Sequence, residues 1–172
     1  METWTPNLSW IEPDLAVGGS FPAEHTGCLA RDHGVGAVVD LRQEACDEPT
    51  ALDACGLRFL HLPTPDMRGV DQPRLDDAVA FAREARQAGL RLLIHCEHGI
   101  GRSATAALCV LVDRGLAPME ALKLAKDQRA LISPSRDQFE AWAAWLGRRG
   151  GVEAPSYHAF GMIAYRHLAQ PV

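Results

Sequence analysis

A cysteine, an arginine and a serine lie close together in a stretch whose spacing suits nucleophilic chemistry on a bound anion. The stretch runs from His95 to Ser103 and reads HCEHGIGRS. A short apolar segment that predicts a buried strand precedes it, and a segment that predicts a helix follows. A loop at a helix N-terminus presents successive backbone N–H groups, and the helix dipole favours anions there. The sequence therefore predicts an anion-binding loop with a nucleophile at its start.

Three side chains of this stretch can carry the chemistry. At the mouth of such a loop, the helix N-terminus and nearby cations favour the thiolate of Cys96, which is the nucleophilic form. Arg102 supplies a planar fork that can hold two equatorial oxygens of a phosphoryl group and stabilise the charge of its transition state. Ser103 can donate its hydroxyl to the thiolate. We therefore expect attack by Cys96 on a bound phosphorus atom.

The remaining residues of the loop are expected to surround the anion. Gly99 and Gly101 let the backbone curl tightly enough to form a nest of N–H groups. His95 is expected to fix the loop through its ring nitrogens. The predicted substrate-binding set is Glu97, His98, Gly99, Ile100, Gly101 and Arg102.

Cleavage of a phosphate ester also needs a proton for the leaving oxygen. Asp66 is the predicted general acid because it follows a predicted strand and lies on a loop bracketed by proline and glycine, LPTPDMRG at 62–69. The same carboxylate could then activate water. Asp71 is the nearest competitor, but its position before Gln-Pro suits a helix cap better.

The elements that must position these groups alternate along the chain. We expect one or two strands within 8–19 and further strands at 35–41, 57–62 and 91–95. We expect a short helix within 22–34 and another that ends near residue 56. Longer helices are expected at 71–88, 103–114, 118–129, 136–146 and about 158–168. The nearly all-apolar character of the strand at 91–95 predicts a central, buried position in a sheet. The order of elements predicts an α/β fold with a central, mostly parallel sheet flanked by helices. We expect a catalytic domain at 1–147 and a C-terminal tail at 148–172.

Composition narrows the class of protein. The chain has 172 residues, 47% hydrophobic and 23% charged, with a formal net charge of −5. We expect no nucleic-acid partner, since that function usually needs a clustered basic face. We expect no membrane association, since no apolar run approaches about 20 residues. The five cysteines form no paired motif, and no signal peptide is visible, so we expect reduced thiols in the cytoplasm and no metal site.

The pattern His-Cys, five residues, Arg-Ser is the signature of the protein tyrosine phosphatase superfamily. The short chain and the Thr-Pro-Asp segment at 64–66 make the sequence resemble the dual-specificity, VH1-like branch. The resemblance covers roughly residues 8–146 and includes the VVDLR strand at 38–42. It implies Cys96 as nucleophile, Arg102 as phosphate binder, Asp66 as general acid and base, Ser103 in breakdown of the intermediate, and Gln138 in positioning water.

The sequence departs from the family pattern in three respects. Ala104 stands where the family often has glycine, which should affect packing more than chemistry. Glu97 stands where phosphoinositide-directed relatives tend to have basic residues, which disfavours that substrate class. The tyrosines, Tyr157 and Tyr165, both lie in the tail, so we expect a shallower pocket than in tyrosine-specific relatives.

The resemblance predicts a cofactor-independent, monomeric phosphatase that hydrolyses phosphate monoesters through a phosphocysteine, most simply phosphorylated Tyr, Ser or Thr in proteins. A small molecule or a nucleotide is the alternative substrate. Three other classes stay open: a rhodanese-type sulfurtransferase, a low-molecular-weight phosphatase or arsenate reductase, and a module that binds phosphorylated partners without turnover. The upstream Asp66 and the late position of the cysteine loop disfavour the first two.

Overall fold

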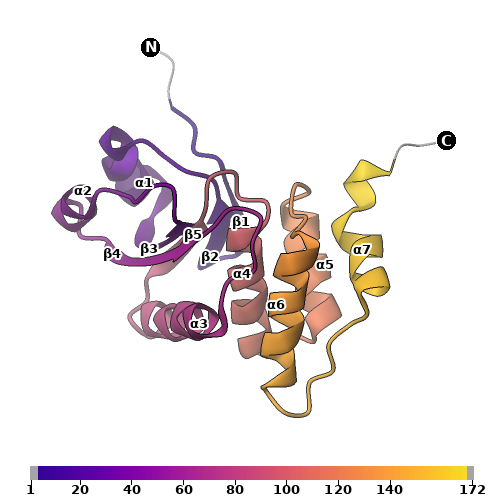
Figure 1. The fold of residues 1–172 in the computed structure, drawn as a ribbon. Coiled ribbons are helices and arrows are strands. Elements are labelled where there is room, and N and C mark those ends of the chain that lie inside the picture. Colours follow the sequence, from indigo (N-terminus) through magenta and orange to yellow (C-terminus); the bar gives the residue numbers. More distant parts are fainter. Residues whose placement is uncertain (1–3, 170–172) are drawn as a thin grey trace.

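A five-stranded mixed sheet forms the centre of the molecule (Figure 1). The computed structural model describes residues 4–169, so the first residues of the predicted domain (1–3) and the last of the predicted tail (170–172) lie outside it. The strand order is β1-β2-β5-β3-β4, with only the β1–β2 pair antiparallel. The strands are β1 (Leu8–Glu12), β2 (Leu15–Gly18), β3 (Val35–Arg42), β4 (Arg58–Thr64) and β5 (Arg91–His95). The predicted fold class is confirmed.

Helices cover both faces of this sheet. On one face lie the short η1 (Ala23–His25), α1 (Thr26–His33) and α2 (Pro49–Ala54). On the other lie α3 (Gln72–Gln87), α4 (Arg102–Asp113), α5 (Pro118–Gln128), α6 (Arg136–Gly147), α7 (Tyr157–Ala164) and the short η2 (Arg166–Leu168).

Strand β3 shows how the sequence divides the interior into two cores. Val38 belongs to the core under α1 and α2, whereas its neighbours Ala37 and Val39 belong to the larger core under α3 to α7. Successive side chains of a strand point to opposite faces, so an unbroken apolar run requires burial on both. Strand β5 follows the same rule, since Leu92 and Ile94 belong to the larger core and Leu93 to the smaller one.

The ends of the helices follow local chemistry. Helix α1 ends where Gly34 adopts a left-handed backbone (φ +68°), and the side chain of Asp71 caps α3 by accepting from the N–H of Arg74. Helix α4 begins at Arg102, one residue before the predicted start. Because its first turn then includes Arg102 and Ser103, both side chains are fixed by the helix backbone.

The C-terminal segment is packed against the larger core. Phe160 in α7 is fully buried, and its ring centroid lies 4.8 Å from that of Phe139 and 6.0 Å from that of Trp142, both in α6. Figure 1 shows α7 alongside α5 and α6, away from the sheet. Between residues 4 and 169, no helix combines the length and the apolar character that a bilayer crossing requires.

Candidate active site

The cysteine loop leaves the carboxyl end of β5, the strand between β2 and β3, and turns directly into α4. Cys96 is buried, and its Sγ lies 3.2 Å from the hydroxyl of Ser103 across the loop. In the described part of the chain, the backbone N–H groups of residues 97–104 donate to no protein acceptor. Successive N–H groups left unpaired at a helix N-terminus form a site for an anion.

Glycine is required at the tightest point of this loop. Gly99 has a left-handed backbone (φ +70°), and a Cβ there would lie 2.5 Å from the carbonyl carbon of Gly18. A Cβ on Gly101 would collide with the side-chain amide of Gln138. The two glycines predicted from the sequence are therefore needed both for the curl of the loop and for its close packing.

Arg129 holds the loop from behind. Its Nε donates to the carbonyl of Gly99 (2.8 Å), and its Nη2 donates to the carbonyl of His98 (3.0 Å). Other donors of the same buried guanidinium reach Asn7 and Ser9 in the N-terminal segment. By holding these carbonyls on the outside of the curl, Arg129 favours the inward direction of the following N–H groups.

Arg102 presents one edge of its guanidinium to the loop cavity. Its Nη1 and Nη2 donate end-on to the carboxylate of Glu44 (2.8 and 2.7 Å), and Nη1 also donates to the carbonyl of Thr64 (2.9 Å). The buried Nε has no hydrogen-bond partner among residues 4–169. Of the five N–H donors of an arginine, this leaves Nε–H and one N–H of Nη2, which lie side by side. That edge matches two oxygens of a phosphoryl group.

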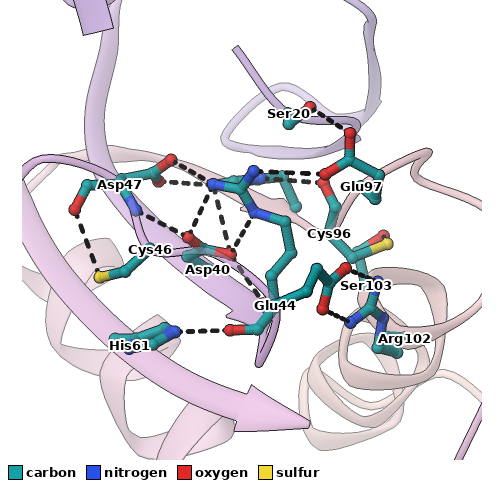
Figure 2. Close-up of polar contacts among 12 residues, drawn as sticks. Ser20, Asp40, Glu44, Cys46, Asp47, His61, Cys96, Glu97, Arg102 and Ser103 are labelled. Atoms are coloured by element: carbon teal, nitrogen blue, oxygen red, sulfur yellow. Dashed lines mark hydrogen bonds and ion pairs between the residues drawn. The ribbon is translucent and has the colours of Figure 1, made fainter. Parts of the chain in front are cut away.

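Glu44 was not among the predicted site residues. It follows β3, which neighbours β5 in the sheet. Figure 2 shows its carboxylate facing the guanidinium of Arg102. The hydrogen bonds from Arg102 lower the pKa of Glu44 to about 2. Burial acts to lower the pKa of Arg102, but the same hydrogen bonds outweigh it, and the charge of Cys96 adds to the increase. The carboxyl end of a neighbouring parallel strand is the signal that could have pointed to Glu44.

Asp66 lies on the loop that follows β4, and this loop brings it close to the site, as the sequence predicts. One carboxylate oxygen is 3.4 Å from Nη2 of Arg102 and accepts from the N–H of Met67, which has a left-handed backbone (φ +62°). The Asp66 side chain is 65% exposed. It therefore faces the free edge of Arg102 while remaining open to solvent.

A cavity of about 110 Å³ joins these groups. It is lined by Asp66, Met67, Cys96, His98, Ile100, Gly101, Arg102, Ser133 and Gln138. Met67 and Ser133 were not among the predicted site residues. The side chain of the predicted residue Glu97 turns elsewhere: it accepts from Arg42 (3.3 Å) and from Ser20 (3.1 Å), so only its backbone N–H remains for an anion.

A buried polar network supports the loop from the β3 side (Figure 2). Asp40, paired with His95 across β3 and β5, accepts from Nε and Nη2 of Arg42 (both 3.0 Å). Burial acts to raise the pKa of Asp40, but the hydrogen bond from Arg42 and the proximity of His95 outweigh it and lower the pKa. The ring of His95 lies 2.6 Å from the carboxylate of Asp47 and 3.1 Å from the carbonyl of Cys96. The predicted role of His95 in fixing the loop agrees with this geometry.

Two groups in this network place atoms of metal-ligand type within 4.8 Å of one another: Asp40 with Cys46 and His61, and Asp40 with Asp47 and His95. Both groups depend on Asp40, whose oxygens already accept from Arg42 and from the N–H of Asp47. A metal ion would have to displace these bonds beside a guanidinium. The network is therefore better explained as a support for the loop.

The comparisons with known proteins agree with this geometry. A family profile described as "Swiss Army Knife protein, DSP-PTPase phosphatase domain" matches residues 5–142. The chain belongs to the dual-specificity branch of the protein tyrosine phosphatase superfamily. The matched region is thus a domain of the cysteine-dependent phosphatase type.

Individual relatives are distant. Dual specificity protein phosphatase 8 of Mus musculus is 29% identical over 130 residues, which is 74% of this chain and 19% of the relative. Dual specificity protein phosphatase 26 of Bos taurus is 36% identical over 110 residues, 62% of this chain and 52% of the relative. The crystal structure of Tk-PTP in its active form superposes with a TM-score of 0.76 at 27% identity, covering 83% of this chain and 98% of that one. This chain thus spans about a fifth of the length of the first of these curated relatives and about half that of the second.

Proposed function

We propose that this phosphatase hydrolyses phosphate monoesters on proteins through a phosphocysteine at Cys96. The observation that carries the proposal is the convergence of three groups on one cavity. The Cys96 thiol lies at the start of an unpaired row of N–H groups, Arg102 offers a free donor edge, and the Asp66 carboxylate lies 3.4 Å from that same guanidinium. A nucleophile, an anion clamp and a proton donor are the parts that this reaction requires.

In the first step, the thiolate of Cys96 attacks phosphorus, and the bond between phosphorus and the ester oxygen breaks. The leaving oxygen keeps the bonding electrons and takes a proton from Asp66. The N–H groups of the loop and the free edge of Arg102 stabilise the charge on the three equatorial oxygens. The products are phospho-Cys96 and a free alcohol or phenol.

In the second step, the Asp66 carboxylate takes a proton from water, and the water oxygen attacks phosphorus. The phosphorus–sulfur bond breaks, inorganic phosphate leaves, and the thiolate is restored. The hydroxyl of Ser103, 3.2 Å from Sγ, can donate to the sulfur as it gains charge. Gln138 lines the same cavity and is proposed to orient the attacking water.

The shape of the cavity favours a phosphorylated side chain over a large free ligand. It is small, and the exposed Asp66 and Met67 stand at its mouth, so a phosphorylated residue projecting from a protein surface can enter. Met67 is 64% exposed and offers an apolar contact to the ring or aliphatic part of such a residue. Nucleotides and small phosphate esters are the alternative substrates. A cytoplasmic location and a monomeric state remain predictions.

The test is the hydrolysis of para-nitrophenyl phosphate with EDTA present. Wild type should be active, Cys96→Ser should bind the ester without turnover, and Cys46→Ser, at an exposed cysteine, should behave as wild type. Equal activity of Cys96→Ser and wild type would refute the proposed nucleophile. Phosphopeptides should then be hydrolysed with a higher kcat/KM than nucleoside monophosphates; the reverse order would reassign the substrate class.

The role of Asp66 is tested by the nature of the leaving group. Asp66→Ala should slow the hydrolysis of an alkyl phosphate by about 10²–10⁴-fold, the usual contribution of a positioned general acid. It should slow the activated aryl ester much less, because a nitrophenolate leaves without a proton. Equal slowing of both esters would move the acid role to another residue.

A further inference from the structure

Residues 131–138 connect the two loops of the active site. The N–H of Ser133 donates to the carbonyl of Ile100 in the cysteine loop (3.0 Å). The hydroxyl of Ser135 donates to the carbonyl of Met67 in the acid loop (2.8 Å), and the carboxylate of Asp137 accepts from the N–H of Gly69 (2.8 Å). This connecting segment therefore sets how the acid loop lies relative to the phosphate site.

A buried ammonium and a partly buried hydroxyl donate to the backbone of the connecting segment. Nζ of Lys126 donates to the carbonyl of Ile132 (2.6 Å), and the hydroxyl of Tyr165 donates to the carbonyl of Pro134 (2.6 Å). These carbonyls flank Ser133, which lines the cavity. The segment is thus restrained on both sides of the residue that touches the site.

Helix α7 positions both of these donors. Tyr165 follows the last residue of α7, and Lys126 also donates to the carbonyl of Ala164 in α7 (2.7 Å). Helix α7 is in turn anchored by the fully buried Phe160. Lys126 is 1% exposed, and a buried ammonium is costly unless its N–H donors are satisfied. Two of its three acceptors are the carbonyl of Ile132 in the connecting segment and the carbonyl of Ala164 in α7. Because the ammonium must reach both carbonyls at once, α7 and the connecting segment can shift little relative to each other.

We propose that helix α7, which lies beyond the residues matched by the family profile, is a positioning element for catalysis, and that Tyr165 is a positioning residue. It acts through Pro134 and the connecting segment, which place Asp66 over the phosphate site. The proposal rests on the proposed function of Asp66 and Cys96. Loss of the Tyr165 hydroxyl should therefore loosen the acid loop more than the anion loop, which keeps its own hydrogen bonds to Arg129.

The test compares Tyr165→Phe with Tyr157→Phe as a matched control. Tyr157 belongs to the same aromatic cluster, but within residues 4–169 its hydroxyl forms a hydrogen bond only with that of Tyr165 (3.3 Å). Tyr165→Phe should speed amide hydrogen exchange in the connecting segment roughly three- to tenfold, as expected for one lost hydrogen bond. The reporters are the N–H groups of Ser133 and Ser135, which donate to Ile100 and to Gln138. Tyr157→Phe should leave this exchange unchanged.

Steady-state kinetics should show slower hydrolysis of the ester that needs a general acid and unchanged hydrolysis of the ester that does not. In Tyr165→Phe, kcat for an alkyl phosphate should fall roughly three- to tenfold, with kcat for para-nitrophenyl phosphate and both KM values within twofold of wild type. Unchanged exchange, equal effects of the two variants, or equal slowing of the two esters would each overturn the proposal. Exchange is measured without substrate. An inactive wild type would therefore overturn the proposed function, whereas the exchange result would still decide whether α7 restrains the segment.

Discussion

Replacing Arg102 by lysine tests the assignment of its free donor edge. In the structure the guanidinium donates two N–H groups to Glu44 and one to the carbonyl of Thr64. Two N–H groups are left for the phosphoryl group. A lysine ammonium has three donors in all, without a planar fork. If it keeps one bond to Glu44 and one to Thr64, it offers at most one to the substrate.

The expected size of the effect follows from this loss of at least one donor. Removing one donor that stabilises developing negative charge costs about 10²–10³ in kcat, roughly 2.7–4 kcal/mol. We therefore expect kcat of Arg102→Lys on para-nitrophenyl phosphate to fall by about 10²–10³. KM should change much less, because lysine keeps the positive charge that attracts the ground-state anion.

Arg129→Lys is the matched control, because Arg129 is also a buried arginine beside the loop but directs its donors to protein oxygens. It should lower the free energy of unfolding by about 1–3 kcal/mol, the cost of leaving buried acceptors unpaired, and reduce kcat less than tenfold. Steady-state kinetics and urea denaturation measure both variants. The reasoning is refuted if folded Arg102→Lys keeps more than a tenth of wild-type kcat.

Two further predictions concern the loop and its anchor. Gly99→Ala should destabilise the fold by about 1–3 kcal/mol in thermal denaturation and abolish phosphate binding, because alanine is strained at φ +70° and its Cβ would meet Gly18. Gly147→Ala, whose Cβ would meet nothing within 4 Å, should be neutral or stabilising; equal effects would contradict the argument. Glu44 has its pKa lowered to about 2 from a usual 4.5, so its contribution to stability is present above pH 4.5 and is lost as the pH falls towards 2. The stability gap between wild type and Glu44→Gln should therefore shrink over that range, and a gap as large at pH 2.5 as at pH 6 would show that the ion pair does not stabilise the fold.

The sequence determined those features that depend on neighbouring residues. The apolar run of β5, the glycines at 99 and 101 and the helical pattern after Arg102 fix a strand, a tight loop and a helix in direct succession. Cys96, Arg102 and Ser103 are brought together by that succession alone. The family signature could therefore be read from the sequence, and so could the order of strands and helices.

Only the tertiary structure decided which distant residues support the loop. Glu44 reaches Arg102 across 58 positions because the sheet order places β3 beside β5, and Arg129 reaches Gly99 across 30 because α5 ends at the loop. Local preferences contain no information on these pairings, since they follow from how the elements pack. The same is true of the predicted tail. Its helix could be predicted from its own residues. Its contacts with the segment beside the active site depend on the burial of Phe160 and on the long-range hydrogen bonds of Lys126 and Tyr165.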